Sequence, residues 1–161
     1  MIFSAAYDAL VAQIVSVFPE HVELINPYKP EDNDDLTMKG AWGTCTLDGT
    51  PRKGEAGCTI SISRDVQLVL CRRVLKGDMN RSAVAAAARR TAEKELIEDF
   101  ETLLIAIENN IALQNTGDAE NKISSFIYEQ DNGLEFIRPE SNNFIMLRAV
   151  FSMAYDRSLN E

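Results

Sequence analysis

The sequence is short of the residues with which most enzymes and metal proteins do their chemistry. It has one histidine, His21, and three cysteines, Cys45, Cys58 and Cys71, in 161 residues. No two cysteines lie at CxxC spacing, and a lone histidine with no nucleophile or carboxylate motif beside it is more often structural than catalytic. We therefore predict no catalytic residue and no metal site, and we expect reduced thiols that lie partly in the core.

Patterns for nucleotide binding, membrane insertion and export are also missing. No GxGxxG or GxxxxGK[ST] occurs, so we expect no cofactor. No run of about 18 apolar residues occurs, and Met1-Ile2-Phe3-Ser4 lacks the basic region of a secretory signal. The acidic run over 31–35 lacks the spacing and the glycine of an EF-hand, which favours a solvated loop. We expect a soluble chain that stays inside the cell.

Charge of one sign dominates what is present. The chain has 25 acidic and 16 basic residues, a net charge of −9. Tight binding of nucleic acid requires Lys and Arg that replace counterions along the phosphates, so we expect no specific DNA or RNA binding. An acidic surface nevertheless suits a protein past which DNA slides, because it repels phosphate.

The hydrophobic residues, 45% of the chain, are enough for one folded domain over 1–161. Residues 27–56 hold three prolines, several glycines and the acidic run, and they predict a long flexible polar loop, with a strand over 41–47 as an option. Trp42 and Met38 are unusual in so polar a stretch. Either the loop folds back on its own core, or Trp42 anchors a partner.

Hydrophobic periodicity predicts the remaining elements. Steps of three and four predict helices, and alternation predicts strands. We expect helices over 3–18 and 81–112, a short strand near 22–25, a long strand over 58–74, a hairpin of 123–129 with 134–137 and a strand over 144–155. The fold class is therefore α+β: one mixed or antiparallel sheet with a short N-terminal helix and a long central helix packed on one face.

The long strand offers the clearest candidate interface. Its alternation predicts one buried face, and its phase is unbroken across Arg64 and Asp65. Fully extended it would span roughly 50 Å, more than a domain of this size needs, so one end should project. Arg72 and Arg73 at its end could meet an acidic surface of a neighbouring subunit. The candidate assembly interface comprises Met38, Trp42, Arg64, Asp65, Arg72 and Arg73.

The order of these elements resembles the tail terminator proteins of long-tailed, non-contractile phages, the lambda-type gpU family, and is most similar to the T-five-type siphophage members. The resemblance covers nearly the whole chain. It depends on the helix that ends at Phe18-Pro19, the polar loop, the long strand, the long helix and the closing strand over 144–155. This sequence is longer than the lambda type, mostly through residues 27–56.

The resemblance implies a structural virion protein. Such proteins form a hexameric ring that caps the tail tube, stops its polymerisation and provides the docking surface for the capsid neck. The implied partners are further copies of the chain, the tail tube protein and the head-tail connector or neck protein, while DNA passes through the lumen without specific binding. The chain would be a monomer until it meets the tube, and assembly would take place in the host cytoplasm.

Two alternatives remain open at this point. The chain could be another phage neck or head-completion protein, because these share folds and the sequence does not separate them. It could also be a small ligand-binding α+β module whose loops over 27–56 and 114–122 close over a ligand.

Overall fold

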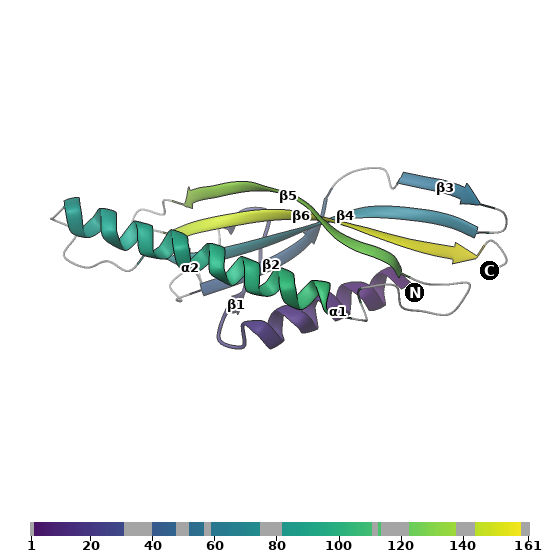
Figure 1. The fold of residues 1–161 in the computed structure, drawn as a ribbon, viewed down its shortest axis with the longest axis horizontal. Helices are drawn as coiled ribbons and strands as arrows, with labels where there is room; N and C mark the ends of the chain where they lie inside the picture. Colours follow the sequence, from purple (N-terminus) through teal and green to yellow (C-terminus); the bar gives the residue numbers. More distant parts are fainter. Residues whose placement is uncertain are drawn as a thin grey trace.

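The computed structural model describes residues 2–30, 40–47, 52–56, 59–74, 82–110, 113, 123–137 and 144–158. The elements in chain order are α1 (Ile2–Val17), β1 (Val22–Glu23), β2 (Gly40–Thr46), β3 (Arg52–Ala56), β4 (Thr59–Arg73), α2 (Ser82–Glu108), β5 (Ile123–Ile137) and β6 (Phe144–Ser158). The predicted fold class is confirmed. The fold is α+β, and both helices pack against the sheet (Figure 1). Neither described helix combines the length and the apolar character needed to cross a membrane.

One sheet of six strands forms the body of the molecule. The strand order is β1-β2-β4-β6-β5, and β3 pairs with β4 beyond β2. Only β1 and β2 run parallel; every other pair is antiparallel. β2 and β3 therefore follow each other along the same edge of β4. The expected loop over 27–56 thus holds two strands. The aromatic and β-branched residues of β2 favour extended pairing. β3 has no such residue and is a strand through its pairing with β4.

The long strand β4 organises the sheet. It pairs with β6 over its whole length, from Thr59 opposite Ser158 to Arg73 opposite Phe144. In Figure 1 the first part of β4, the end of β6 and the short β3 extend past the two helices. The prediction of a single long strand with one projecting end is therefore confirmed.

The prediction that β4 buries only one face is wrong in its middle. Residues 66–71 are all buried, because a second cluster covers the face away from the helices. Leu24 and Pro27 cross β2 there above Gly43, where an added Cβ would lie 2.7 Å from the Cβ of Pro27. The close approach requires glycine at this position. The second cluster consists of Leu24, Ala41, Val69, Cys71, Phe144 and Met146.

The main core lies between the sheet and the helices. Each helix contributes one stripe at steps of three and four, which is the spacing of one helix face. The stripe of α1 comprises Ala6, Leu10 and Ile14, and that of α2 comprises Ala92, Leu96, Phe100, Leu103 and Ile107. They meet the helix-facing side of β4 and β6, where Leu68 and Phe151 are fully buried. Because both stripes pack on this side of the sheet, the two helices lie on the same face of it.

The expected hairpin over 123–137 is a single strand instead. β5 runs along β6 from Ile123 to Ile137, with register shifts at three places. The residues predicted to turn the chain form a bulge: Gly133 has a φ of 73°, and its N–H donates to Asp131 at 2.8 Å. A glycine in the left-handed region suits a bulge as well as a hairpin turn. Because the residues on both sides of this segment pair with the long strand β6, the segment is a bulge and not a hairpin turn.

Candidate assembly surfaces

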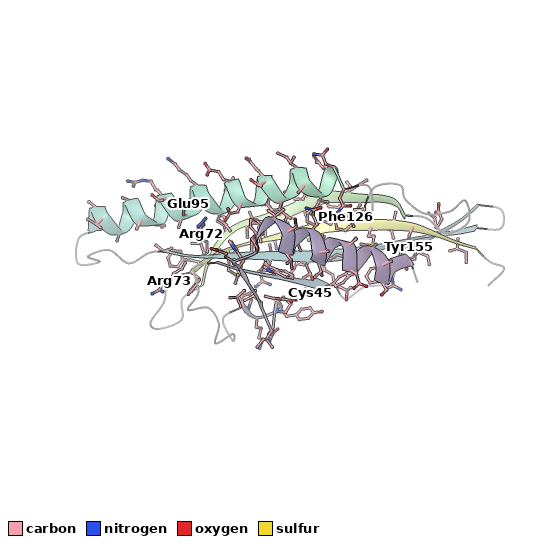
Figure 2. The ribbon with its side chains drawn as sticks, turned by 90° about the horizontal axis from the view of Figure 1, so that it is seen from below. Cys45, Arg72, Arg73, Glu95, Phe126 and Tyr155 are labelled. Carbon is pink, nitrogen blue, oxygen red and sulfur yellow. The ribbon has the colours of Figure 1, made fainter. Side chains whose placement is uncertain are left out.

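The six predicted interface residues do not form one surface. Arg72 lies on the helix-facing side of β4 and reaches up to α2 (Figure 2). Its guanidinium group bonds Glu95 at 3.2 Å and Asp99 at 3.3 Å. Only 15% of its side chain is exposed. Arg72 therefore joins α2 to the sheet within one subunit, and its contact with a neighbouring subunit stays a prediction.

Asp99 is the point where three elements meet. Burial raises the pKa of its carboxyl, while Arg72 and His21 lower it. His21 lies with its Nε2 4.0 Å from Asp99 and stacks on Phe18 at 4.7 Å between ring centroids. The histidine thus ties the segment after α1 to α2, which is a structural role.

Arg72→Met is expected to lower the free energy of unfolding by about 1–3 kcal/mol, because it leaves the partly buried Asp99 without its cation. Arg72 lowers the pKa of Asp99, so the variant raises that pKa further above its ordinary value of 3.8. A carboxyl with a raised folded-state pKa contributes most stability below its ordinary pKa, and loses that contribution as pH rises through the raised value. The deficit should therefore grow as pH rises above about 4, the ordinary pKa of the carboxyl.

Urea unfolding at several pH values measures this. Arg89→Met is the matched control, because Arg89 pairs with Glu93 on the exposed side of α2. An exposed pair of this kind contributes less than about 1 kcal/mol. If both variants lost the same free energy of unfolding at every pH, the result would contradict the role assigned to Arg72.

Arg64 and Asp65 lie where β4 begins to project. The Arg64 side chain is exposed, its Nε donates to the hydroxyl of Tyr155 at 3.1 Å, and its guanidinium lies 5.7 Å from the ring centre of Phe3. The carbonyl oxygen of Asp65 accepts from the N–H of Leu47 at 3.2 Å. Arg64 therefore sits on the surface at the junction of β4, β6 and the start of α1. Its interface role stays a prediction.

Arg73 points to the face of the sheet opposite Arg72 (Figure 2). Successive residues of a strand face opposite sides, so the two arginines do not act as a basic pair. Arg73 is half-buried and lies next to the second cluster. Met38 is outside the described residues.

Trp42 lies in the main core, and the partner-anchor interpretation is wrong for the folded chain. Its side chain is 2% exposed, and its cross-strand partner in β4 is the buried Leu70. The hydroxyl of Tyr7 on α1 donates to Thr44 of the same strand at 2.8 Å. The loop therefore returns to its own core as β2, which is the first of the two interpretations of this segment.

The described thiols are protected. Cys45 and Cys71 are buried and unpaired. Burial raises the pKa of both, that of Cys71 to about 12, so both remain protonated at neutral pH. Among the described residues, no three His, Cys, Asp or Glu side chains gather as metal ligands would.

Sequence reasoning missed the apolar surface on α2 and β5. Six of the nine large apolar side chains exposed in the described part of the chain belong to these two elements. A pocket of about 300 Å³ also lies between them. Its lining comprises Leu104, Ile107, Glu108, Phe126, Ile127, Tyr128 and Phe151. Exposed apolar residues gathered in this way are typical of an association surface rather than of free surface.

The outer edge of β5 is a further candidate surface. β5 is the last strand of the sheet, so no described strand pairs with its outer edge. Ile127, Leu134 and Phe136 are 52%, 37% and 42% exposed along it. The hydroxyl of Tyr128 bonds the carboxylate of Asp131, a contact that raises the pKa of Tyr128 to about 12. The alternation of Leu134 and Phe136 was the sequence signal, and the expected hairpin obscured it.

No protein-family model matches the chain, and no curated protein matches it. A solved structure that is similar to it comes from the virion of a native gene transfer agent particle. The alignment covers 95% of this chain and 92% of that chain, with 12% identical residues and a TM-score of 0.42.

Proposed function

We propose that this chain is a structural protein of a phage virion, and specifically the tail terminator of a long-tailed, non-contractile phage. It acts by assembling, not by catalysis. Six copies form a ring that caps the tail tube, stops its polymerisation and offers the docking surface for the neck protein. The order of the elements supports this proposal. The long strand and the long helix that follows it are part of the element order in which the chain resembles that family.

The observation that carries the proposal is the presence of two different surfaces at opposite ends of one sheet. The projecting end comprises the start of β4 and the end of β6, with Arg64 and Tyr155 at its base. The apolar part of β5, with Leu134 and Phe136, pairs with the other end of β6. A closed ring requires heterologous contacts between unlike surfaces of identical subunits. One subunit of this shape offers both.

The charge supports a lumen through which DNA passes. With a net charge of −9, the chain repels phosphate at long range. A ring of such subunits would surround DNA without holding it. Assembly in the host cytoplasm and a final place at the neck of the tail belong to the same proposal.

Negative-stain electron microscopy of the chain mixed with tail tubes tests the proposal. We expect a ring of density at one end of each tube. A variant with Leu134→Glu and Phe136→Glu should fold and fail to form the ring, because both side chains are exposed in the free subunit. Matched exposed substitutions away from this surface, Val15→Glu and Ile25→Glu, should leave the ring intact. Tubes that stay bare under every condition would refute the proposal. Binding to the neck alone would favour the head-completion alternative.

A further inference from the structure

The outward face of α2 carries a second pattern that the fold uses only at Leu104, which packs partly against the main core. Residues of this face recur at alternating steps of four and three: Ala83, Ala87, Arg90, Lys94, Ile97, Glu101, Leu104 and Glu108. At about 100° per residue they form one stripe, on the side of the helix away from its buried stripe. All are exposed except the half-buried Leu104. An alternation of three and four is the spacing with which helices pack against each other as coiled coils.

The two halves of this stripe differ in size and charge. The first half has small and basic residues, Ala83, Ala87, Arg90 and Lys94. The second half has large apolar and acidic residues, Ile97, Glu101, Leu104 and Glu108. Arg90, Glu101 and Glu108 form no ion pair with any described residue. Each half is therefore complementary to the other half and not to itself.

We infer that α2 is a self-association surface, on which α2 of a second copy of this chain packs antiparallel about a twofold axis between Glu95 and Leu96. In this register Arg90 lies opposite the partner's Glu101, and Ala87 lies opposite the partner's Leu104. Both pairs occur twice by symmetry. The small alanine accepts the large leucine, and the unlike charges meet.

The exposed apolar residues of α2 support the same register. Val84, Ile97 and Ile105 are 38%, 37% and 58% exposed. Val84 and Ile105 flank the stripe on the same side, and antiparallel pairing brings each opposite the partner's copy of the other. The pairing thus covers every exposed large apolar side chain of α2. A parallel arrangement would instead place Arg90 opposite the partner's Arg90 and Glu101 opposite the partner's Glu101, which repel.

The N-terminal part of α2 is accessible for this contact. Figure 1 shows it extending past the end of the sheet. Residues 83–91 are exposed or half-buried, whereas the buried stripe begins at Ala92. The contact also leaves the outer edge of β5 free. It does not depend on the proposed function.

Sedimentation velocity of the full chain from about 5 µM to about 500 µM tests this inference. We expect a concentration-dependent dimer. Arg90→Glu alone and Glu101→Arg alone should each weaken it by about tenfold or more, because each places like charges opposite each other. The double variant with both changes should restore it, because the unlike pair is rebuilt with its signs exchanged. Glu20→Arg, an exposed charge reversal outside α2, should leave it unchanged.

Circular dichroism of each variant confirms that the monomer remains folded. A chain that stays monomeric at every concentration would overturn the inference, as would a dimer that the single exchanges do not weaken or the double exchange does not restore. These outcomes are separable from those for tail capping. A monomeric chain that still caps tubes refutes the dimer alone, and a dimer that fails to cap tubes refutes the proposed function alone.

Discussion

Leu68→Asp is expected to leave the chain without a folded state at neutral pH. Leu68 is fully buried on the helix-facing side of β4, between Thr44 of β2 and Ala149 of β6. No described cation lies in this cluster, whose members are all apolar. A buried carboxylate without a partner costs several kcal/mol, which is comparable with the whole stability of about 5–15 kcal/mol of a typical domain.

The measurement is urea unfolding followed by far-ultraviolet circular dichroism. Leu68→Asp should show no cooperative transition, whereas Leu68→Ala should still fold, with a loss of about 2–5 kcal/mol. Ile25→Asp is the control, because its side chain is 84% exposed and should tolerate the charge. A cooperative transition of Leu68→Asp close to that of the unchanged chain would show that β4 does not face a sealed core.

Trp42→Ala is expected to lower the free energy of unfolding by about 3–5 kcal/mol, the usual cost of removing a large aromatic side chain from a core. Trp42 fills the space between β2 and the helices. Its removal leaves a cavity in this core, while the hydrogen bond of Tyr7 on α1 to Thr44 of β2 still joins the helix to the strand. The loss should also expose β2 to local opening.

Tyr28→Ala is the matched aromatic control. Tyr28 is 57% exposed, and its hydroxyl donates to the carbonyl of Thr46 at 3.1 Å. Its removal should cost about 1 kcal/mol or less. If the two substitutions cost the same, or if Trp42→Ala changed only assembly, Trp42 would be a surface anchor after all.

The sequence predicted those elements whose pattern is long and regular. α1, β4, α2 and β6 each repeat their apolar positions over 15 residues or more, so the period identifies the element and the side that faces the main core. β3 could not be found in this way, because Arg52-Lys53-Gly54-Glu55-Ala56 has no alternation. Only its pairing with β4 makes it a strand.

Local sequence signals gave a wrong prediction where pairing with a strand distant in the sequence determines the structure. Asp131-Asn132-Gly133 has the residues of a tight turn, and Gly133 does adopt a positive φ, yet pairing with β6 makes the segment a bulge. The arginine pair shows the opposite case. Strand alternation already implies that Arg72 and Arg73 face opposite sides. The sequence also places Glu95 and Asp99 one helical turn apart, but the contact of that turn with Arg72 requires the fold.

The interface residues were the least predictable part. Their selection depended on unusual residues, such as the single tryptophan, and on a basic pair. The structure instead buries Trp42 and joins Arg72 to α2. The surfaces that remain apolar and unpartnered, α2 and the edge of β5, consist of common residues such as Ile97, Ile105 and Phe136. Only burial distinguishes these from core residues of the same kind.

The most direct test of the central claim is the imaging of tail tubes grown with increasing amounts of the chain. If the chain terminates tails, tubes should stop growing once it is added, and each should carry one ring at one end. The variant with Leu134→Glu and Phe136→Glu should leave growth unaffected. Tubes that lengthen at an unchanged rate beside the folded, unmodified chain, with no ring at either end, would contradict the claim.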